Sequence, residues 1–256
     1  MKPVHIRWRF ATRWALRHAL LSVVVALISA ILVFELWYPM PYRALLRVGG
    51  IFLLVLVVDV VCGPLMTLVL ASPRKSKREM TLDLGLIALI QTAALAYGMH
   101  AVWTARPAVL AFETDRLTVI SANEIDHDAL DSAPDALHTL PLSGVLHVGT
   151  RKPQNNAELL RSIDLSLAGL SPAMRPAWWV PMAAQHDEMR ARAKPLAALM
   201  AQRPEDSAVL AKAASTAGYP VETLTYLPLT SSKTREWVAL LDSSLKMVGY
   251  APVDGF

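Results

Sequence analysis

The chain has 256 residues, of which 54% are hydrophobic, and its formal net charge at pH 7 is +4. A mean hydropathy of +0.37 is high for a wholly soluble protein and indicates that part of the chain lies in a lipid bilayer. The single cysteine, Cys62, excludes a disulfide within the chain, and basic residues that flank apolar segments argue against a nucleic-acid partner.

Three apolar segments predict transmembrane helices over residues 18–37, 48–71 and 82–103. Each reaches the ~20 residues that a helix needs to cross the ~30 Å hydrocarbon core of a bilayer. The first is longer than the apolar core of a cleavable signal peptide, which reaches ~15 residues. We therefore expect it to remain in the protein as a signal anchor.

Lysine and arginine residues predict the orientation of these helices. They are denser in residues 1–17 and in the 72–81 loop than between the first two apolar segments. The positive-inside rule places these two regions, a basic N-terminus and a basic loop, in the cytoplasm. Three crossings then place residues 104–256 on the opposite side, which in a bacterium is the periplasm. We expect a multi-pass inner-membrane protein with a periplasmic C-terminal domain.

Asp59 lies near the centre of the second apolar segment. A charged aspartate at that depth costs ~3 kcal/mol on insertion scales, so the side chain should face the helix bundle or a water-filled cavity. We expect it to be neutral and hydrogen-bonded. If the second and third segments pack antiparallel, Gln91 lies about one turn from Asp59, and Ser29 of the first segment lies at comparable depth.

Gly63 and Pro64 follow Asp59 by about one turn. Pro64 has no N–H, so it should free the carbonyl of Val60 and kink the helix. Asp59 and this carbonyl would then share one intramembrane polar site, for which three uses compete: an internal helix contact, a proton or ion path, and a docking point for another protein's transmembrane helix. The lack of a relay of aspartate, glutamate or histidine through the segments argues against the path, since Glu35, the acidic residue of the first segment, lies near the far-side interface.

Residues 104–256 predict an α+β domain with antiparallel strands. Residues 108–121 alternate in polarity and predict two strands joined by a turn at residues 114–116. The acidic stretch that follows suits a solvated loop or short helix, and Asp164–Ala168 suits a short helical piece. Further elements are predicted in chain order: helices over 185–202 and 204–217, then strands over 221–229, 236–242 and 245–252, with a hairpin turn at 242–244.

No cluster in this domain has the spacing of a catalytic or metal site. The acidic stretch Glu124–Asp135 lacks the glycine and final glutamate of an EF-hand loop. The histidines lack the i, i+4 spacing of zinc ligands, and the two S-x-x-K strings lack the companion motifs of a serine nucleophile. We therefore expect no enzymatic activity, no metal and no cofactor.

The adjacent residues Trp178 and Trp179 form an aromatic segment bounded by prolines. On an extended stretch successive side chains face opposite sides, so both rings cannot enter one core. One of them is then a candidate partner contact, because tryptophan is enriched at binding hot spots. The alternative, that both rings pack under a loop, is equally open.

Several sequence blocks together resemble the TfpX/TfpZ family of type IV pilin accessory proteins. Their order and spacing match over residues 20–125, although Leu117 and Thr118 depart from the family pattern. The blocks are Asp59 with CGPLMTLVL, Asp83 with LGLIALIQTAALAYG, ARP at 105–107 and FETDRLTVISANEI at 112–125. The later segments AWWVPM and LTYLPL are similar more loosely.

The resemblance implies a non-enzymatic inner-membrane protein that assists the major pilin of a type IV pilus and influences surface piliation. Pilin subunits wait in the membrane as single apolar helices that carry a glutamate, so the site around Asp59 is a candidate contact for such a helix, with the periplasmic domain touching the pilin head. The alternative is a membrane-anchored periplasmic sensor that binds a small ligand. Its weakness is that the predicted cytoplasmic segments include no output domain.

Overall fold

The computed structural model describes the backbone of residues 3–256 and the side chains of residues 6–50 and 52–256. Lys2, part of the predicted basic N-terminus, lies outside the described residues. The chain forms two compact units. One contains residues up to Tyr38 together with Val48–Thr104, and the other contains Pro39–Arg47 together with Ala105–Phe256.

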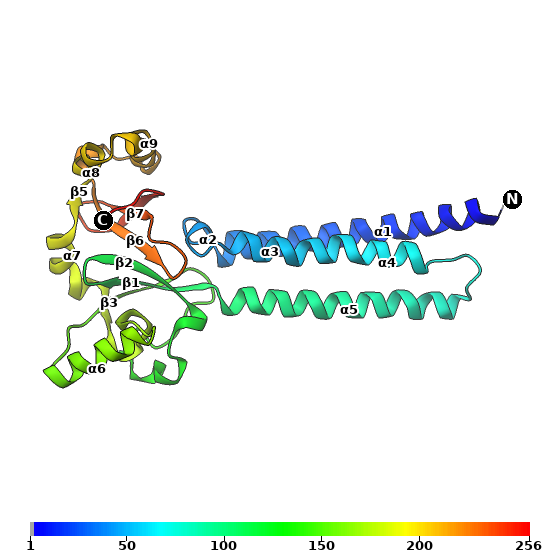
Figure 1. The fold of residues 1–256 in the computed structure, drawn as a ribbon, viewed down its shortest axis with the longest axis horizontal. Helices are drawn as coiled ribbons and strands as arrows, with labels where there is room; N and C mark the ends of the chain where they lie inside the picture. The colour runs from blue at the N-terminus through cyan, green and yellow to red at the C-terminus, as the bar shows by residue number, and fades with distance from the viewer. Residues whose placement is uncertain (1–2) are drawn as a thin grey trace. The chain divides into compact units, whose positions relative to one another are not determined.

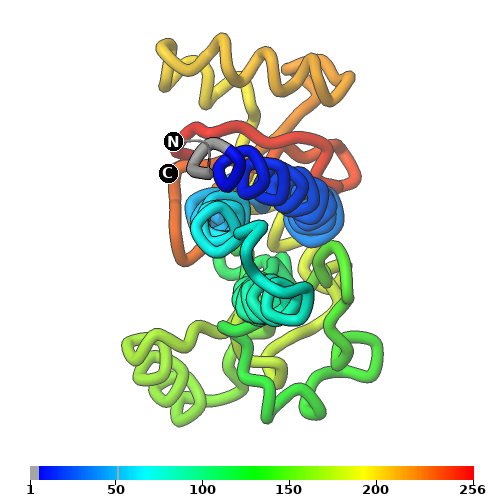
Figure 2. Tube along the Cα trace, turned by 90° about the vertical axis from the view of Figure 1, so that its right-hand side faces the viewer, coloured from blue at the N-terminus to red at the C-terminus, as the bar shows by residue number. Residues whose placement is uncertain are grey.

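The first unit consists of three long helices that run side by side (Figures 1 and 2). The helix α1 (Pro3–Ile31) continues into a π-helical end, η1 (Leu32–Trp37). The second helix is continuous but changes type along its length, and the third is α5 (Lys77–Thr104). The parts of the second helix are α3 (Val48–Val57), the π-helical η2 (Val58–Cys62) and α4 (Gly63–Leu70).

All three helices are long and apolar enough to cross a membrane, over Ile6–Trp37, Val48–Leu70 and Lys77–Thr104. The first and third therefore begin earlier than the apolar segments predicted from the sequence. The added turns are rich in arginine, lysine and glutamate, which are good helix formers, so the helix continues beyond the apolar part. The apolar pattern locates a helix but underestimates its length.

The helical unit turns its apolar side chains outward. Leu20 of α1, Leu54 of α3 and Leu89 of α5 are each about two-thirds exposed in the isolated chain. The buried positions include polar side chains such as Ser22 and Thr67. This arrangement suits a lipid environment, in which helices associate through small and polar residues rather than through a hydrophobic core.

Aromatic contacts join the end of η1 to the end of α5. The rings of Trp37 and Trp103 lie 4.9 Å apart, and Tyr38 Oη donates a hydrogen bond to the carbonyl of Val102 at 2.8 Å. Tryptophan and tyrosine are enriched at membrane interfaces because their rings are apolar and their edges polar. These contacts fix the ends of α1 and α5 against each other.

The second unit is built on one mixed sheet with the strand order β4-β3-β1-β2-β6-β7-β8, and a short β5 also pairs with β6 (Figure 1). The strands in chain order are β1 (Pro107–Glu113), β2 (Arg116–Ser121), β3 (Leu146–Thr150), β4 (Trp179–Pro181), β5 (Lys194–Pro195), β6 (Thr225–Ser231), β7 (Trp237–Leu241) and β8 (Met247–Ala251).

Both predicted hairpins are present. The strands β1 and β2 pair antiparallel around a tight turn in which Thr114 has a φ of 63°. The strands β7 and β8 also pair antiparallel, and the Asp242 carboxylate accepts the backbone N–H groups of Ser244 and Lys246 in their turn. Local alternation and turn residues were sufficient to predict these pairs.

The predicted antiparallel strands are present, but the sheet is mixed. The strand β3 runs parallel to β1, and β6 runs parallel to β2. Parallel neighbours need a crossover of a dozen or more residues, and the segments before β3 and before β6 are both long enough. The strand β3 was missed, because its five residues include histidine, glycine and threonine and show no clean alternation.

The helices of this domain differ in part from their predicted limits. A full helix, α6 (Asn156–Leu167), replaces the short piece predicted at Asp164–Ala168, and Asn155 caps it by accepting the N–H of Glu158. The predicted helix over 185–202 is broken, since Pro195 cannot donate within a helix and the chain becomes extended there. Its parts are α7 (His186–Arg192) and α8 (Leu196–Gln202), followed by α9 (Ser207–Ala217).

Short helical turns complete the domain. They are α2 (Tyr42–Leu45) and the 3₁₀ turns η3 (Ala122–Glu124), η4 (His127–Ser132), η5 (Pro172–Met174), η6 (Pro176–Trp178), η7 (Met182–Gln185), η8 (Pro204–Asp206) and η9 (Val221–Thr223). The loop that carries α2 belongs to this domain, because Ser231 Oγ donates to the carbonyl of Leu45 at 2.7 Å.

Two apolar cores lie along the sheet. One joins β1, β2 and β3 to the loop segments around Leu137 and Ala173, and it includes Trp179. The other joins β6, β7 and β8 to α8 and α9, with Leu196 and Leu210 fully buried. The helix α6 contributes no residue to either of these two cores.

Candidate functional site

The three helices of the first unit line an open-sided cavity of about 120 Å³, termed here the polar groove. Side chains from α1, η2 and α5 contribute to it, so no single helix forms the site. Its lining residues are His18, Leu21, Ser22, Val25, Asp59, Ala88, Gln91, Thr92 and Leu95. The groove combines an apolar wall with hydroxyl, amide, imidazole and carboxyl groups.

Asp59 occupies this groove, but its Oδ1 atom lacks the hydrogen bond that the sequence interpretation expected. The side chain is 7% exposed, and its Oδ1 atom has no hydrogen-bond partner among the described residues. Leaving a buried polar atom without a partner costs free energy comparable to a lost hydrogen bond. The groove therefore presents an acceptor that a donor from outside the three helices can satisfy.

Gln91 contacts Asp59 through the backbone rather than through the carboxyl group. Its Nε2 donates to the Asp59 carbonyl oxygen at 2.8 Å. The predicted neighbourhood of Gln91 and Asp59 is present, but the bond leaves the Asp59 carboxyl group free for another partner.

The π-helical turn η2 explains why the carbonyl of Asp59 is available to accept a hydrogen bond from Gln91. In such a turn each N–H donates to the carbonyl five residues earlier, so the residue that would donate to Asp59 is Pro64, which has no N–H. The expectation that Pro64 frees the carbonyl of Val60 assumed an ordinary α-helix. The wider turn moves the freed carbonyl to Asp59, where Gln91 binds it.

Gly63 allows the close approach of the two helices at this point. A Cβ atom at this position would overlap the side-chain amide of Gln91. Gly63 is buried, and the helix α4 begins there with Pro64 in its first turn. The four predicted intramembrane residues, Asp59, Gln91, Gly63 and Pro64, therefore meet in one place.

The sequence interpretation missed the contribution of α1. His18 Nδ1 lies 2.6 Å from Thr67 Oγ1, which fixes the level of α1 against α4, and Ser22 then lines the groove. Ser29 was the residue of the first segment expected at a depth comparable to that of Asp59, and it is buried but does not line the groove. Depth counted from the ends of the apolar segments was misleading because α1 extends well beyond its apolar part.

The two adjacent tryptophans of the second unit are both buried. Trp179 is 1% exposed, and its Nε1 donates to the carbonyl of Ala173 at 2.9 Å. Trp178 is 7% exposed, and the guanidinium groups of Arg151 and Arg175 lie 4.6 and 4.5 Å from its ring centroid. The alternation argument does not apply, since Trp178 ends a 3₁₀ turn instead of extending a strand. A partner contact at these residues stays a prediction.

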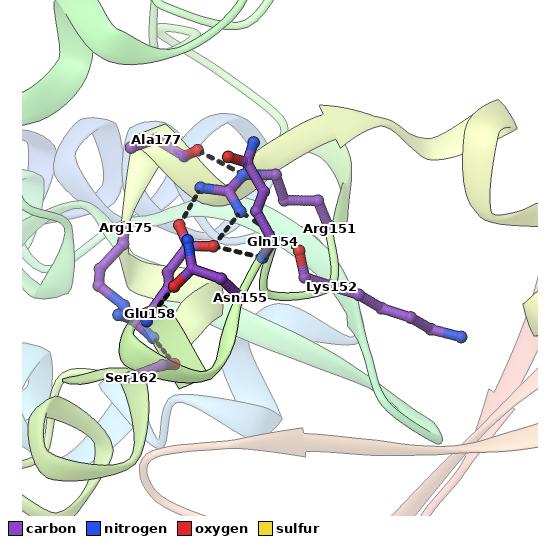
Figure 3. A network of polar contacts seen from close by, with 8 residues as sticks. All are labelled: Arg151, Lys152, Gln154, Asn155, Glu158, Ser162, Arg175 and Ala177. Carbon is purple, nitrogen blue, oxygen red and sulfur yellow. Dashed lines mark hydrogen bonds and ion pairs between the residues drawn. The ribbon is translucent and has the colours of Figure 1, made fainter. Parts of the chain in front are cut away.

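Arg151 belongs to a polar network that holds α6 on the domain (Figure 3). Its guanidinium donates to both carboxylate oxygens of Glu158, at 2.6 and 3.1 Å, and Arg175 donates to Ser162 Oγ at 2.6 Å. The hydrogen bonds from Arg151 lower the pKa of Glu158 to about 2. Bidentate pairs of this kind are among the stronger polar contacts in proteins.

The described residues contain no group of three or more histidine, cysteine, aspartate or glutamate side chains that could hold a metal ion. The carboxyl group of Glu113, at the end of β1, has its pKa raised by burial. It accepts from Ser171 and the backbone of Ala173, so it orders the loop beside Trp178. The absence of a metal, a cofactor and catalysis remains a prediction.

Three long apolar helices with a polar groove, joined to an α+β domain, define the class of this chain as a helical membrane-type unit with a separate folded domain. Residues 6–47 match the family model described as "Fimbrial assembly protein FimB". No solved structure matches the chain.

The chain is also similar to curated proteins of Dichelobacter nodosus. It is 33% identical to "Fimbrial assembly protein, serogroup I" and 34% identical to "Fimbrial assembly protein, serogroup E1", in each case over 98% of both chains. It is 39% identical to "Fimbrial assembly protein, serogroups C1 and C2" over 51% of this chain and 97% of that one. The chain therefore belongs to the fimbrial assembly protein FimB family. The TfpX/TfpZ family name stays a prediction.

Proposed function

We propose that this protein is a non-enzymatic accessory protein of type IV fimbriae that holds the transmembrane helix of the major pilin in its polar groove before assembly. The names of its full-length relatives, which are fimbrial assembly proteins, support a role in fimbrial biogenesis. The three apolar helices are compatible with membrane anchoring. The distribution of basic residues favours an inner-membrane location with the N-terminus in the cytoplasm and the C-terminal domain in the periplasm.

The observation that carries the proposal is the unpaired Oδ1 of Asp59 in the polar groove. Gln91 is already engaged by the Asp59 carbonyl, so it does not satisfy this atom. A groove with an apolar wall and an unpaired buried acceptor is complementary to an apolar helix that carries a hydrogen-bond donor at the same depth. A protonated glutamate of a pilin helix is such a donor, and it is itself costly to leave in lipid.

The energy of such a contact suits temporary holding. An interhelical hydrogen bond in a membrane contributes ~0.6 to 2 kcal/mol, because the separated helices find other partners. A client helix held by one such bond and by side-chain packing can be released to the growing fibre. Tighter binding would oppose assembly.

The test compares the recovery of the pilin from detergent extracts with the wild-type protein, with Asp59→Leu and with Ser29→Ala. Ser29 is the matched control, because it is buried and polar but does not line the groove. The expected result is a roughly three- to thirtyfold weaker recovery with Asp59→Leu, which corresponds to ~0.6 to 2 kcal/mol, and no change with Ser29→Ala. Equal recovery with a correctly inserted Asp59→Leu protein would exclude Asp59 from holding the pilin.

A further inference from the structure

The sheet of the C-terminal domain carries polar side chains on two of its inner strands. The strands β2 and β6 are neighbours within the strand order (Figure 1). Thr118 of β2 is paired with Thr230 of β6, and their hydroxyl oxygens lie 3.1 Å apart. Thr230 is 5% exposed. A buried polar side chain on an inner strand is unusual, because such strands normally present apolar residues to a core.

These hydroxyl groups lie between the two apolar cores, on one face of the sheet. Ala111 of β1 is paired with Thr118, and directly paired residues of neighbouring strands point to the same face. Ala111 belongs to the first core. Tyr226 belongs to the second core, and it precedes Thr230 by four residues on β6, so it shares that face. The apolar cover of the sheet is therefore interrupted at β2 and β6.

A cleft of about 400 Å³ opens over this interruption. The turn between β1 and β2, the residues around η5 and the loop between β6 and β7 all contribute to it, and all of them belong to the C-terminal domain. Six of its lining residues carry hydroxyl groups, and three are charged, namely Glu113, Arg116 and Arg235. The volume lies in the range of small-molecule sites, ~300 to 1,000 Å³. The cleft is therefore large enough for a ligand and mainly polar.

Arg116 is held at this cleft by contacts that leave most of its donors available. Its Nε donates to Asp115 Oδ1 at 2.8 Å, and its guanidinium carbon lies 4.6 Å from the ring centroid of Phe256. A guanidinium group has five N–H donors, and Asp115 accepts from only one of its nitrogens. The Nη groups of Arg116 therefore remain available to a ligand in the cleft.

Arg235 reaches the cleft from the loop between β6 and β7, which hydrogen bonds hold in place. The backbone N–H of Ser231 donates to the carbonyl of Thr234, and Ser231 Oγ accepts the backbone N–H groups of Lys233 and Thr234. The guanidinium group of Arg235 has no ion pair or hydrogen bond among the described residues. The loop therefore presents an unpaired cation beside the polar floor.

The charges that line the cleft favour an anionic ligand. Glu113 is the acid among the lining residues, and it already accepts from Ser171 and the backbone of Ala173. Two guanidinium groups thus accompany one carboxyl group that has partners of its own. The groups left without partners are positively charged hydrogen-bond donors, and arginine donors of this kind bind carboxylate and phosphate oxygens strongly.

We infer that this cleft binds a small anionic molecule whose carboxylate or phosphate group is held by Arg116 and Arg235. The hydroxyl pair of Thr118 and Thr230 gives the bound molecule a polar floor, which excludes a purely apolar ligand. The site lies wholly within the C-terminal domain and is independent of the polar groove that we propose to hold the pilin helix.

Calorimetric titration of the full-length protein in detergent tests this site with inorganic phosphate and with citrate, at constant ionic strength. The expected result is saturable binding of at least one of these anions. The anion that binds more tightly identifies the recognised group as phosphate or carboxylate. If the wild-type protein binds neither anion saturably, the inference is overturned and the groove proposal stands unchanged.

Two variants distinguish a built site from a general attraction of anions. Arg235→Gln removes an exposed guanidinium group that supports no other contact, and it should weaken binding roughly tenfold or more, because a charge-assisted hydrogen bond is lost. Lys233→Gln is the matched control, since it removes the same charge from the same loop at a residue that does not line the cleft. It should leave binding unchanged. Equal weakening in both variants, or equal binding by both variants and the wild type, would overturn the inference.

Discussion

The two units of this protein use apolar side chains in opposite ways. In the helical unit Leu20 is 68% exposed while Ser22, two residues further on, is buried. In the C-terminal domain Leu110 of β1 is 1% exposed, and the charged residues of the domain lie mainly at its surface. The same residue type therefore takes an exposed position that suits lipid in one unit and a core position in the other.

The helix α6 differs from the rest of the C-terminal domain in the exposure of its leucines. It belongs to the C-terminal domain, yet Leu167 is 83% exposed while the carboxylate of Glu158 binds Arg151. An outward apolar face in the helical unit suits a lipid environment, whereas the exposed leucines of α6 belong to a domain that has buried cores of its own. Exposure of an apolar side chain therefore has a different setting in each unit.

The largest expected effect comes from the core of the C-terminal domain. Replacing Trp179 with alanine should lower the stability of this domain by ~3 to 5 kcal/mol, because a fully buried ring and its hydrogen bond are lost. Thermal unfolding of the full-length protein in detergent measures this change. Leu20→Ala, which shortens an equally apolar but exposed side chain, should have little effect; a comparable loss there would contradict the assignment of that surface to lipid.

A smaller effect is expected where α3 and α5 approach each other closely. A Cβ atom at Gly98 would lie 2.8 Å from Val55, whose branched side chain has little freedom to move. Gly98→Ala should therefore destabilise the helical unit by ~1 to 3 kcal/mol.

Gly85→Ala is the control for Gly98→Ala, because no atom lies within 4 Å of its added Cβ. It should be neutral or stabilising by up to ~1 kcal/mol through helix propensity. Denaturant titration in mixed micelles distinguishes the two. Equal behaviour of the two variants would show that α3 and α5 do not pack at this position.

The ion pair that docks α6 predicts a dependence of stability on pH. The hydrogen bonds from Arg151 lower the pKa of Glu158 from an ordinary value of 4.5 to about 2. A depressed carboxyl pKa stabilises the folded state above the unfolded-state pKa, and this contribution is lost as the pH falls through the folded-state pKa. The difference in Tm between wild type and Glu158→Gln should be constant above ~pH 5 and should disappear between about pH 4.5 and 2. A difference that grows toward low pH would contradict this assignment.

The smallest expected effect concerns Leu160, an exposed leucine of α6. Leu160→Lys should change the stability of the domain by no more than ~0.5 kcal/mol, because the side chain is already exposed and contacts little. Thermal unfolding at neutral pH measures it. A loss above ~2 kcal/mol would show that Leu160 supports the fold.

The sequence was a good guide where the determining contacts are local. The three apolar helices and the hairpins around Thr114 and Asp242 follow from composition, alternation and turn residues. The parallel pairing of β3 with β1 does not, because its register depends on residues that are distant in the sequence. The break before α8 was signalled by Pro195, a residue that the prediction of one long helix passed over.

The candidate site was predictable only in part for a related reason. Asp59 and Gln91 could be paired from their depth, but the π-helical turn that redirects Gln91 to a backbone carbonyl has no reliable sequence signature. His18 stands at the edge of the first apolar segment, so it was treated as a boundary residue. The exposed apolar residues of α6 were not recognised, because only its last turns were predicted to be helical.

The most direct test of the central proposal uses two adjacent leucines of α1. Leu21 lines the polar groove, whereas Leu20 is equally exposed but does not. A photo-reactive amino acid at Leu21 should cross-link to the transmembrane helix of the pilin, and the same group at Leu20 should not. Equal cross-linking from both positions, or none from Leu21 in cells that make the pilin, would contradict the proposal that the groove holds the subunit.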